Sequence, residues 1–278
     1  MAHMPSGTVL VTGASTGIGE ATALHLKELG FDAVAAVRKD QDAERLKSQG
    51  LRAVKLDVTD ADSIAAARAQ MGDAPLAGLV NNAGIAVAAP LEFLPLDQLR
   101  RQLEVNVIGQ VAVTQQFLPA LRAARGRIVN VSSIGGRVAL PLVAPYNASK
   151  FALEAISDSL RRELIPHGVD VIVIEPGGVK TPIWGKGNET ADQIQEGMPP
   201  EAQQLYGPMI EALRRETVKI SENTGIEPRE VAEVIGRALT AKRPRTRYLV
   251  GREAKIRGAA ARVMPDRMMD RAIVKQLS

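Results

Sequence analysis

Short apolar runs alternate with longer segments of helical periodicity along most of this 278-residue chain. Six of the runs have the length and the Val, Leu, Ile and Ala content of strands that are buried on both faces of a sheet. The alternation predicts a doubly wound parallel sheet, a Rossmann-type α/β fold with helices on both faces. The six predicted strands cover residues 8–11, 32–37, 53–56, 76–80, 127–131 and 169–174.

Two regions lie outside this alternation. From residue 184 to about residue 223 the sequence turns polar, and we expect its glycines and prolines to divide it into short helical pieces. After residue 251 the chain ends in a basic segment. We therefore predict a single Rossmann-type domain over residues 5–251, with an insertion at about 184–223, and a C-terminal helical tail over residues 252–278.

The tail carries the charge imbalance of the chain. Seven Lys/Arg and three acidic residues lie between Arg252 and Lys275, an excess equal to the net charge of +4 for the whole chain. Pro265 predicts a break between two short helices. We expect the apolar stripe of the first helix to pack on the body of the protein or on a second subunit, with a lid or a membrane-surface contact as the alternative. That stripe consists of Ile256, Ala260, Val263 and Met264.

Composition narrows the class of protein. The chain has no cysteine, which excludes disulfides and thiolate metal sites and favours a reducing, cytoplasmic location. Its scattered histidines have no ligand spacing, so we expect no metal site. No apolar run approaches about 18 residues, the length of a membrane span, and no broad basic stretch suggests a nucleic-acid partner.

A glycine-rich turn follows the first predicted strand. Its pattern is Gly-x-x-x-Gly-x-Gly, directly before a helical segment. Glycine lets the backbone approach a phosphate closely, and a helix N-terminus offers unpaired N–H groups. Strand, turn and helix in this order predict a dinucleotide site, although an ordinary turn can also use glycine. The expected cofactor contacts are Gly13, Ser15, Thr16, Gly17, Ile18 and Gly19.

Two cations end the second predicted strand. NAD-binding proteins usually place an acidic residue there, about 20 residues after the glycine turn, to accept from the ribose 2′-hydroxyl. Here Arg38 and Lys39 take that place, and an arginine can bind a 2′-phosphate bidentately. This favours NADP(H) over NAD(H), while Asp40 and Asp42 directly afterwards argue against it.

Polar residues also end the third and fourth predicted strands. Asp57 and Val58 follow the third strand and are placed to meet an adenine edge. Asn82, Ala83 and Gly84 follow the fourth, at the edge where open α/β sheets bind ligands, and we expect them to contact the cofactor.

Asn106 interrupts an apolar helical stretch. A buried amide needs partners, so this side chain is either satisfied within the core or in contact with a ligand or water.

Tyr146 and Lys150 form a candidate acid–base pair. They are four residues apart on a helix predicted from Pro145 to about Ile165, so they share one face. A nearby ammonium favours the phenolate and lowers the pKa of tyrosine towards a useful range. Ser133 ends the fifth predicted strand, thirteen residues before Tyr146. Alone, the pair would also fit a surface tyrosine beside a solvated lysine.

Taken together, these motifs resemble the short-chain dehydrogenase/reductase family over residues 8–181. The resemblance implies an enzyme that moves a hydride between a nicotinamide cofactor and a carbonyl or alcohol carbon. It also implies cofactor contacts after the sixth strand, at Pro176, Gly177, Val179 and Thr181. The motifs that carry it are Thr12–Gly19, Asn81–Gly84, Asn106, Ser133, Tyr146, Lys150 and Pro176–Gly177.

The resemblance further implies a role for each catalytic residue. Tyr146 would exchange a proton with the substrate oxygen, and Ser133, rather than Ser132, would steady that oxygen. Lys150 would lower the pKa of Tyr146 and bond the nicotinamide ribose, so that both residues also contact the cofactor. Asn106 would hold a water that links Lys150 to solvent.

Within the family, the chain looks most like the retinol- and hydroxysteroid-dehydrogenase-like members. This implies a small apolar steroid-, retinoid- or lipid-like substrate, covered by residues 184–223, and a homodimer or homotetramer paired through the helices that bear Asn106 and Tyr146. Two alternatives stay open. The long insertion and the segment Arg247–Gly251 count against a 3-oxoacyl carrier-protein reductase-like enzyme, and the intact catalytic set counts against a non-catalytic NADP-binding regulator.

Overall fold

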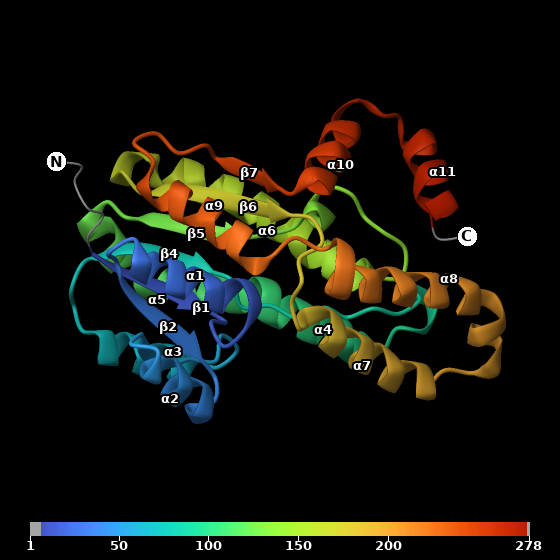
Figure 1. Ribbon diagram of the computed structural model, residues 1–278, viewed down its shortest axis with the longest axis horizontal. Helices are drawn as coiled ribbons and strands as arrows, with labels where there is room; N and C mark the ends of the chain where they lie inside the picture. Colours follow the sequence, from blue (N-terminus) through green and yellow to red (C-terminus); the bar gives the residue numbers. More distant parts are fainter. Residues whose placement is uncertain (1–6, 277–278) are drawn as a thin grey trace.

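Seven parallel strands form one sheet at the centre of the molecule (Figure 1). In the computed structural model, which describes residues 7–276, the strand order is β3-β2-β1-β4-β5-β6-β7. The six predicted strands are all present near their expected bounds, and a seventh pairs with β6. The strands are β1 (Thr8–Thr12), β2 (Asp32–Val37), β3 (Arg52–Lys55), β4 (Leu76–Asn81), β5 (Arg127–Val131), β6 (Asp170–Pro176) and β7 (Arg247–Val250).

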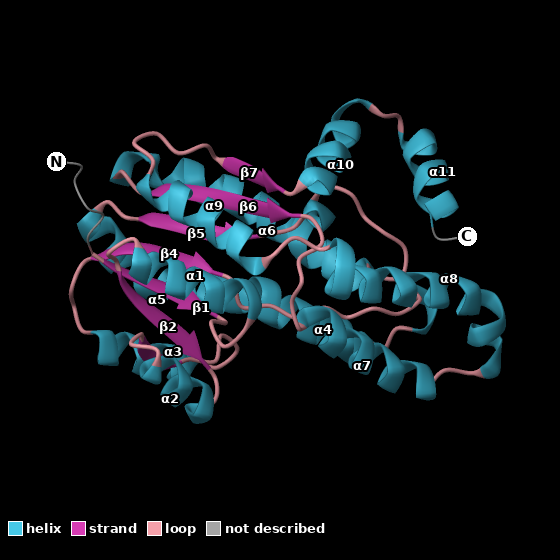
Figure 2. Ribbon diagram, viewed as in Figure 1, coloured by secondary structure: helices cyan, strands magenta, loops and turns pink. Residues whose placement is uncertain are grey.

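Helices cover both faces of this sheet, which confirms the doubly wound α/β fold (Figure 2). Alternate side chains of a strand point to opposite faces, so Val9 and Val11 join one aliphatic core and Leu10 joins the other. The first core lies under α1, α2 and α9, and the second lies under α3, α5 and α6. The helices are α1 (Gly17–Glu28), α2 (Asp40–Ser48), α3 (Ala61–Met71), α4 (Leu96–Leu103), α5 (Gly109–Ala124), α6 (Ala144–Leu164), α7 (Ile183–Glu196), α8 (Pro200–Lys219), α9 (Pro228–Thr240), α10 (Arg252–Val263) and α11 (Asp266–Gln276). Shorter 3₁₀ and π turns are η1 (Leu91–Phe93), η2 (Glu104–Ile108), η3 (Ile134–Gly136), η4 (Ile165–His167) and η5 (Ile220–Thr224).

The order of the strands reverses between β1 and β4. At such a point the loops that leave neighbouring strands turn in opposite directions and open a crevice at the carboxyl edge, where ligands bind. The loops after β1 and β4 nonetheless touch: a Cβ added to Gly13 would lie 2.7 Å from the Ala83 Cα. Helices α7 and α8 extend beyond the same edge of the sheet (Figure 1).

Residues 183–224 form two long helices rather than a series of short pieces. Helix α7 runs through Gly185 and Gly187, and α8 runs through Pro208, so the interruptions expected at these positions are wrong. The break expected near Gly197 and Pro199 is present.

Tertiary contacts explain why these helices persist, because helical stability in proteins comes mostly from packing rather than from propensity. Ile194 of α7 joins a small apolar core with Val87 and Leu94. Asp192 of α7 also forms an ion pair with Arg214 of α8. Local sequence does not report such contacts.

The tail forms the two predicted helices, with the break at Pro265. Two of the four residues of its apolar stripe do not pack on the body, because Ile256 is 58% exposed and Val263 is 82% exposed, whereas Ala260 and Met264 are half-buried. Helix α10 approaches β7 through Ala254 and Gly258 instead. A Cβ on Gly258 would lie 2.9 Å from Leu249, so only a small residue allows this approach.

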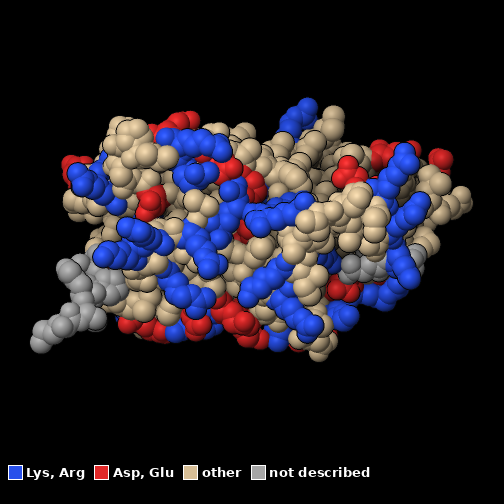
Figure 3. Space-filling model, turned by 90° about the horizontal axis from the view of Figure 1, so that it is seen from above, with Lys and Arg blue, Asp and Glu red and all other residues tan. Residues whose placement is uncertain are grey.

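Beyond α10, helix α11 projects away from the sheet (Figure 1). Lys and Arg side chains are frequent on the face of the molecule seen from above, and acidic and uncharged surface lies between them (Figure 3). Packing of the tail on a second subunit, or its contact with a membrane surface, stays a prediction. Residues 277–278 of the predicted tail and residues 5–6 of the predicted domain lie outside the described residues.

Candidate active site

The turn after β1 is shaped for close approach of the backbone to a bound group. Gly13 and Gly17 have φ angles of 63° and 61°, which residues with a side chain rarely adopt. A Cβ on Gly19 would lie 2.4 Å from the Gly13 carbonyl oxygen and 2.5 Å from Asn82 Nδ2, so this position too accepts only glycine.

Helix α1 begins directly after this turn with its N–H groups available. The N-cap residue, Thr16, makes no side-chain capping hydrogen bond, so the cap supplies no acceptor to the N–H groups of the first turn, which includes Ile18. Unpaired N–H groups and the helix dipole together favour an anion. The turn and the helix end therefore fit the phosphates of a dinucleotide.

Asn82 ties the loop after β4 to the glycine turn. Its Nδ2 donates to the carbonyl oxygens of Thr12, at 2.9 Å, and Gly13, at 3.2 Å. The backbone N–H groups of Asn82 and Ala83 donate to Thr12 Oγ1. Gly84 follows beside Asn106, whose Oδ1 would lie 3.3 Å from a Cβ at that glycine.

Arg45 of α2 also fixes the glycine turn, and sequence analysis did not identify it. Its Nη2 donates to the Ser15 carbonyl oxygen at 2.6 Å, and its Nη1 pairs with Glu20 of α1 at 2.5 Å. A surface arginine on a polar helix carries no signal of such a contact, because the pairing joins two helices that only the fold brings together.

Arg38 and Lys39 are exposed at the end of β2. No ion pair within the described residues 7–276 engages either one. Asp40, one of the two acids that argued against a 2′-phosphate, pairs with Lys55 of β3 at 2.9 Å. Both cations are therefore available to a ligand, and one nearby carboxylate is already neutralised.

At the end of β3, Asp57 stabilises its own turn. Its Oδ1 accepts hydrogen bonds from the Thr59 N–H, at 3.0 Å, and the Thr59 hydroxyl, at 2.8 Å. Val58 is buried, and its carbonyl oxygen would lie 2.6 Å from a Cβ on Gly109. The adenine contact expected at Asp57 and Val58 stays a prediction.

The segment after β6 reaches back to the glycine turn. The Thr181 side chain packs on Gly17, where an added Cβ would lie 3.0 Å from Thr181 Cγ2. Pro176 ends β6, and the N–H of Gly177 donates to the Val250 carbonyl oxygen of β7. The Val179 carbonyl oxygen accepts from the Trp184 indole N–H at 2.8 Å. The fold thus joins two predicted cofactor segments that are far apart in the sequence.

Three candidate catalytic side chains meet where β5 ends beside α6. Ser133 Oγ accepts from the Gly135 N–H at 3.0 Å, and a Cβ on Gly135 would lie 3.4 Å from Ser133 Oγ and 3.3 Å from the Tyr146 ring, so the two side chains meet there. Lys150 Nζ lies 5.7 Å from the centre of the Tyr146 ring and donates to the Val131 carbonyl oxygen at 2.8 Å.

Burial disfavours the charged forms of both Tyr146 and Lys150. It raises the pKa of Tyr146, against the opposing effect of the Ser133 side chain. Burial also lowers the pKa of Lys150 to about 8, against the opposing effect of the Glu154 carboxylate. The sequence predicted that the pKa of Tyr146 is lowered. For the chain by itself this prediction is wrong, because the net effect raises that pKa. At neutral pH Tyr146 is protonated and Lys150 is mostly charged.

Asn106 lies fully buried in the π turn η2. Its Nδ2 donates to the Ile85 carbonyl oxygen, at 3.0 Å, and to Ser149 Oγ, at 3.1 Å, and its Oδ1 accepts from the Ile85 N–H. Both amide hydrogens are used within the core, so a water would have to bind Oδ1 or the backbone carbonyl. Asn106 lies in a π turn, and π turns often mark functional sites. Its role in holding a water stays a prediction.

Two glutamines extend this arrangement, and sequence analysis missed them. Gln102 Oε1 accepts from the Val87 N–H at 2.8 Å, and Gln110 Nε2 donates to the Ala83 carbonyl oxygen at 2.9 Å. With Asn106 they form a row of amides spaced by four that holds the loop after β4 against the helix. The available signal was the spacing of four between these amides.

A family model described as short chain dehydrogenase matches residues 7–192. The chain therefore belongs to the short-chain dehydrogenases, as its motifs predicted. It is an oxidoreductase that acts on a CH–OH or C=O group, and the fold of this family binds NAD or NADP.

Two relatives are similar over almost the whole chain. The NADPH-dependent 3-dehydrocapnine reductase of Ornithobacterium rhinotracheale is 36% identical over 280 residues and covers 96% of each chain. Retinol dehydrogenase 5 of Mus musculus is 36% identical, covering 94% of this chain and 86% of its own. The resemblance to the retinol- and hydroxysteroid-dehydrogenase-like branch is thereby confirmed.

Solved structures show the same fold with either nucleotide. A short chain dehydrogenase from Burkholderia cenocepacia in complex with NADP is 27% identical, with a TM-score of 0.75 and 99% of each chain covered. One from Burkholderia phymatum in complex with NAD has a TM-score of 0.77, covers 96% of this chain and 98% of its own, and at 22% identity shows the fold alone. No helix in residues 7–276 is long and apolar enough to cross a membrane.

Proposed function

We propose that this protein interconverts an apolar ketone or aldehyde and the corresponding alcohol with NADP(H), using Tyr146 as the acid and base. The observation that carries the proposal is the set of buried Ser133, half-buried Tyr146 and buried Lys150, together with a turn shaped for dinucleotide phosphates. The nicotinamide, when bound, supplies or accepts the hydride.

The residues of the chain handle the proton and the orientation. Tyr146, protonated at neutral pH because burial raises its pKa, donates its hydroxyl proton to the oxygen of a carbonyl substrate. Ser133, which lies beside Tyr146, holds that oxygen in place. The ammonium of Lys150, anchored by the Val131 carbonyl oxygen, bonds the nicotinamide ribose and stabilises the phenolate that is left. A protonated Tyr146 is the form from which reduction of a carbonyl begins.

The proposed NADP(H) preference rests on the exposed cations at the end of β2. Arg38 supplies a planar fork that matches a phosphate, whereas the usual ribose-binding carboxylate has no counterpart at this position. The pairing of Asp40 with Lys55 removes one source of repulsion. A relative described as NADPH-dependent supports the same preference.

The proposed apolar substrate rests on the segments that flank the catalytic residues. Residues 134–145, between Ser133 and Tyr146, contain one charged residue, Arg137, and it is bound to Glu175 of β6 at 2.6 Å. Residues 85–90 carry no charge, and the Ala89 N–H donates to the Leu142 carbonyl oxygen, which joins the two segments. The site is thus bordered by uncharged chain.

Tyr146→Phe tests the proposed chemistry. Removing the hydroxyl should lower kcat by about 10²- to 10⁴-fold, the usual contribution of an acid–base group. NADPH binding should persist, because the phosphate turn is untouched. Turnover of apolar ketones with NADPH and fluorescence of the bound nicotinamide measure the two quantities separately. Full turnover by the variant would refute the role of Tyr146, and reduction of charged ketones in preference to apolar ones would refute the substrate class.

A further inference from the structure

The catalytic face of α6 carries a row of ionisable residues. Tyr146, Lys150, Glu154 and Asp158 are spaced by four, so they lie one above the other along the helix. Lys150 is 5% exposed and Glu154 is 8% exposed, although Lys and Glu are seldom this buried without partners. The row leads from the proposed acid to the place where β6 and β7 meet the helix.

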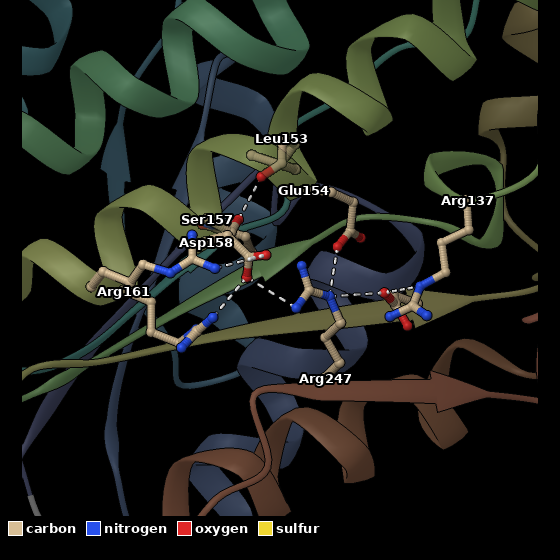
Figure 4. Close-up of polar contacts among 10 residues, drawn as sticks. Arg137, Leu153, Glu154, Ser157, Asp158, Arg161 and Arg247 are labelled. Carbon is tan, nitrogen blue, oxygen red and sulfur yellow. Dashed lines mark hydrogen bonds and ion pairs between the residues drawn. The ribbon is translucent and has the colours of Figure 1, made fainter. Parts of the chain in front are cut away.

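Arg247 of β7 holds two carboxylates of this row (Figure 4). Its Nε donates to Glu154 Oε2 at 3.0 Å, and its Nη1 lies 3.0 Å from Asp158 Oδ1. Its Nε also lies 3.5 Å from Glu175, a fully buried residue of β6 that is bound by Arg137. The last strand of the sheet thereby fixes two successive turns of the helix that carries Tyr146.

Glu154 is bound on one side only. Its Oε1 has no hydrogen-bond partner among the described residues, and neither has Ser132 Oγ. Both groups pack around Gly136, where a Cβ would lie 2.9 Å from Ser132 Oγ and 3.1 Å from Glu154 Cγ. A buried carboxylate with an unpaired oxygen costs stability, which points to a role other than stability.

The electrostatic effect of Glu154 falls on both Lys150 and Glu175. Burial, together with the negative charge of Glu154, raises the pKa of Glu175 to about 7. The negative charge of Glu154 also raises the pKa of Lys150 and so opposes the larger effect of burial. Helix α4 and turn η2, which also pack on α6, contribute buried residues that are neutral, Gln102 and Asn106. The charged and titratable groups that surround Glu154 and Lys150 are Tyr146, Asp158, Glu175, Arg247 and Arg137.

We propose that Glu154 is a positioning residue of the active site: held by Arg247, its carboxylate keeps the ammonium of Lys150 charged beside Tyr146. The inference rests on the proposed function, in which a charged Lys150 assists Tyr146. Without Glu154 the burial of Lys150 is unopposed, and the amine loses its proton at a lower pH. Because the charged form exists below the pKa, the alkaline limit of activity should move to lower pH.

Glu154→Gln tests this with a side chain of the same shape. The amide oxygen can still accept from Arg247, so the fold should be kept, which a thermal melt verifies. The titration of Lys150 is followed by NMR of lysines labelled with ¹³C at Cε, and Lys150→Met assigns the signal. We expect the pKa of Lys150 to fall by roughly one unit, with a matching shift in the alkaline limit of turnover. Glu154→Asp, which keeps the negative charge, should leave the pKa of Lys150 close to its wild-type value.

Asp158→Asn is the matched control, because Asp158 also binds Arg247 but lies a turn further from Lys150. This variant should lower the melting temperature without moving the titration of Lys150. An unchanged titration in Glu154→Gln, or an equal shift in Asp158→Asn, would overturn the inference. Because the titration needs no substrate, this result is independent of turnover. Should Glu154→Gln fail to fold, Glu154→Ala removes the same charge and is judged by the same titration.

Discussion

The proposed NADP(H) preference rests, at the scale of single residues, on an arginine that forms no ion pair in the described chain. Arg38 stands exposed at the edge of the sheet where the ribose of a bound dinucleotide is expected. Asp40, the carboxylate next to this basic pair, is turned to Lys55. On the proposed function, this position would bind a 2′-phosphate more strongly than a 2′-hydroxyl.

Arg38→Ala should weaken NADPH binding by about 10- to 100-fold, the range expected for losing hydrogen bonds between charged groups. NADH binding should change little. Titrations followed by nicotinamide fluorescence give both dissociation constants. Arg122→Ala, which removes another exposed cation on α5, is the control for general electrostatic attraction and should leave NADPH affinity nearly unchanged. Equal loss of NADPH and NADH affinity would contradict the phosphate contact.

Tyr146 and Lys150 show what a residue pattern conveys and what it omits. The spacing of four identified the pair, because it depends only on helical geometry. The direction of the Tyr146 pKa shift did not follow from the pattern, because burial is the larger influence and burial depends on the whole fold. For the same reason Glu154 had no visible role until Arg247 was placed beside it.

At the scale of elements, the glycines divide into those that the structure requires and those that it tolerates. Gly19 lies in the first turn of α1 against the Gly13 carbonyl, and an added Cβ would lie 2.4 Å from that oxygen. Gly185 lies within α7, and no atom would lie within 4 Å of its Cβ. The two positions look alike in the sequence, since both are glycines near turns.

Gly19→Ala should destabilise the protein by about 1–3 kcal/mol, because backbone must shift to admit the methyl group, and should greatly weaken NADPH binding. Gly185→Ala should instead stabilise it by up to about 1 kcal/mol, because alanine suits a helix interior better than glycine. Denaturant unfolding and NADPH titration measure both effects. NADPH affinity could also fall as much in Gly185→Ala as in Gly19→Ala. That result would contradict a specific role of the glycine turn after β1 in nucleotide binding.

At the scale of the whole molecule, the outer face of α6 is left uncovered. Ala148, Phe151 and Ala155 are exposed along it, and Ile108 of η2 is also exposed. Small residues allow close helix–helix approach, and exposed large apolar residues add buried area on association. We propose that a second copy of the chain covers this face, giving the dimer or tetramer that the family resemblance implies.

Ala155→Arg should disrupt that association, because a long charged side chain prevents close approach of the helices. Light scattering after size-exclusion chromatography should show a smaller mass than for the wild type. Ala66→Arg places the same substitution on an exposed position of α3, on another part of the surface, and should not change the mass. A monomeric wild type, or an unchanged mass in Ala155→Arg, would refute this interface.

The sequence by itself determined the local elements along the chain. It showed which apolar runs become strands, which glycine turn precedes α1, and which Ser, Tyr and Lys stand at a strand end and on α6. These features follow from periodicity and from backbone sterics, which act over a few neighbouring residues. The family membership also followed from them, because its motifs are local.

Only the tertiary structure decided how distant segments use one another. It kept α7 and α8 each unbroken through Gly185 and Pro208, by packing Ile194 into a core and pairing Asp192 with Arg214. It left Ile256 and Val263 exposed, since Gly258 is what meets β7. It also brought Arg247 to Glu154, 93 residues away in the sequence. Burial and long-range charge pairing depend on the complete fold, so no local pattern could specify them.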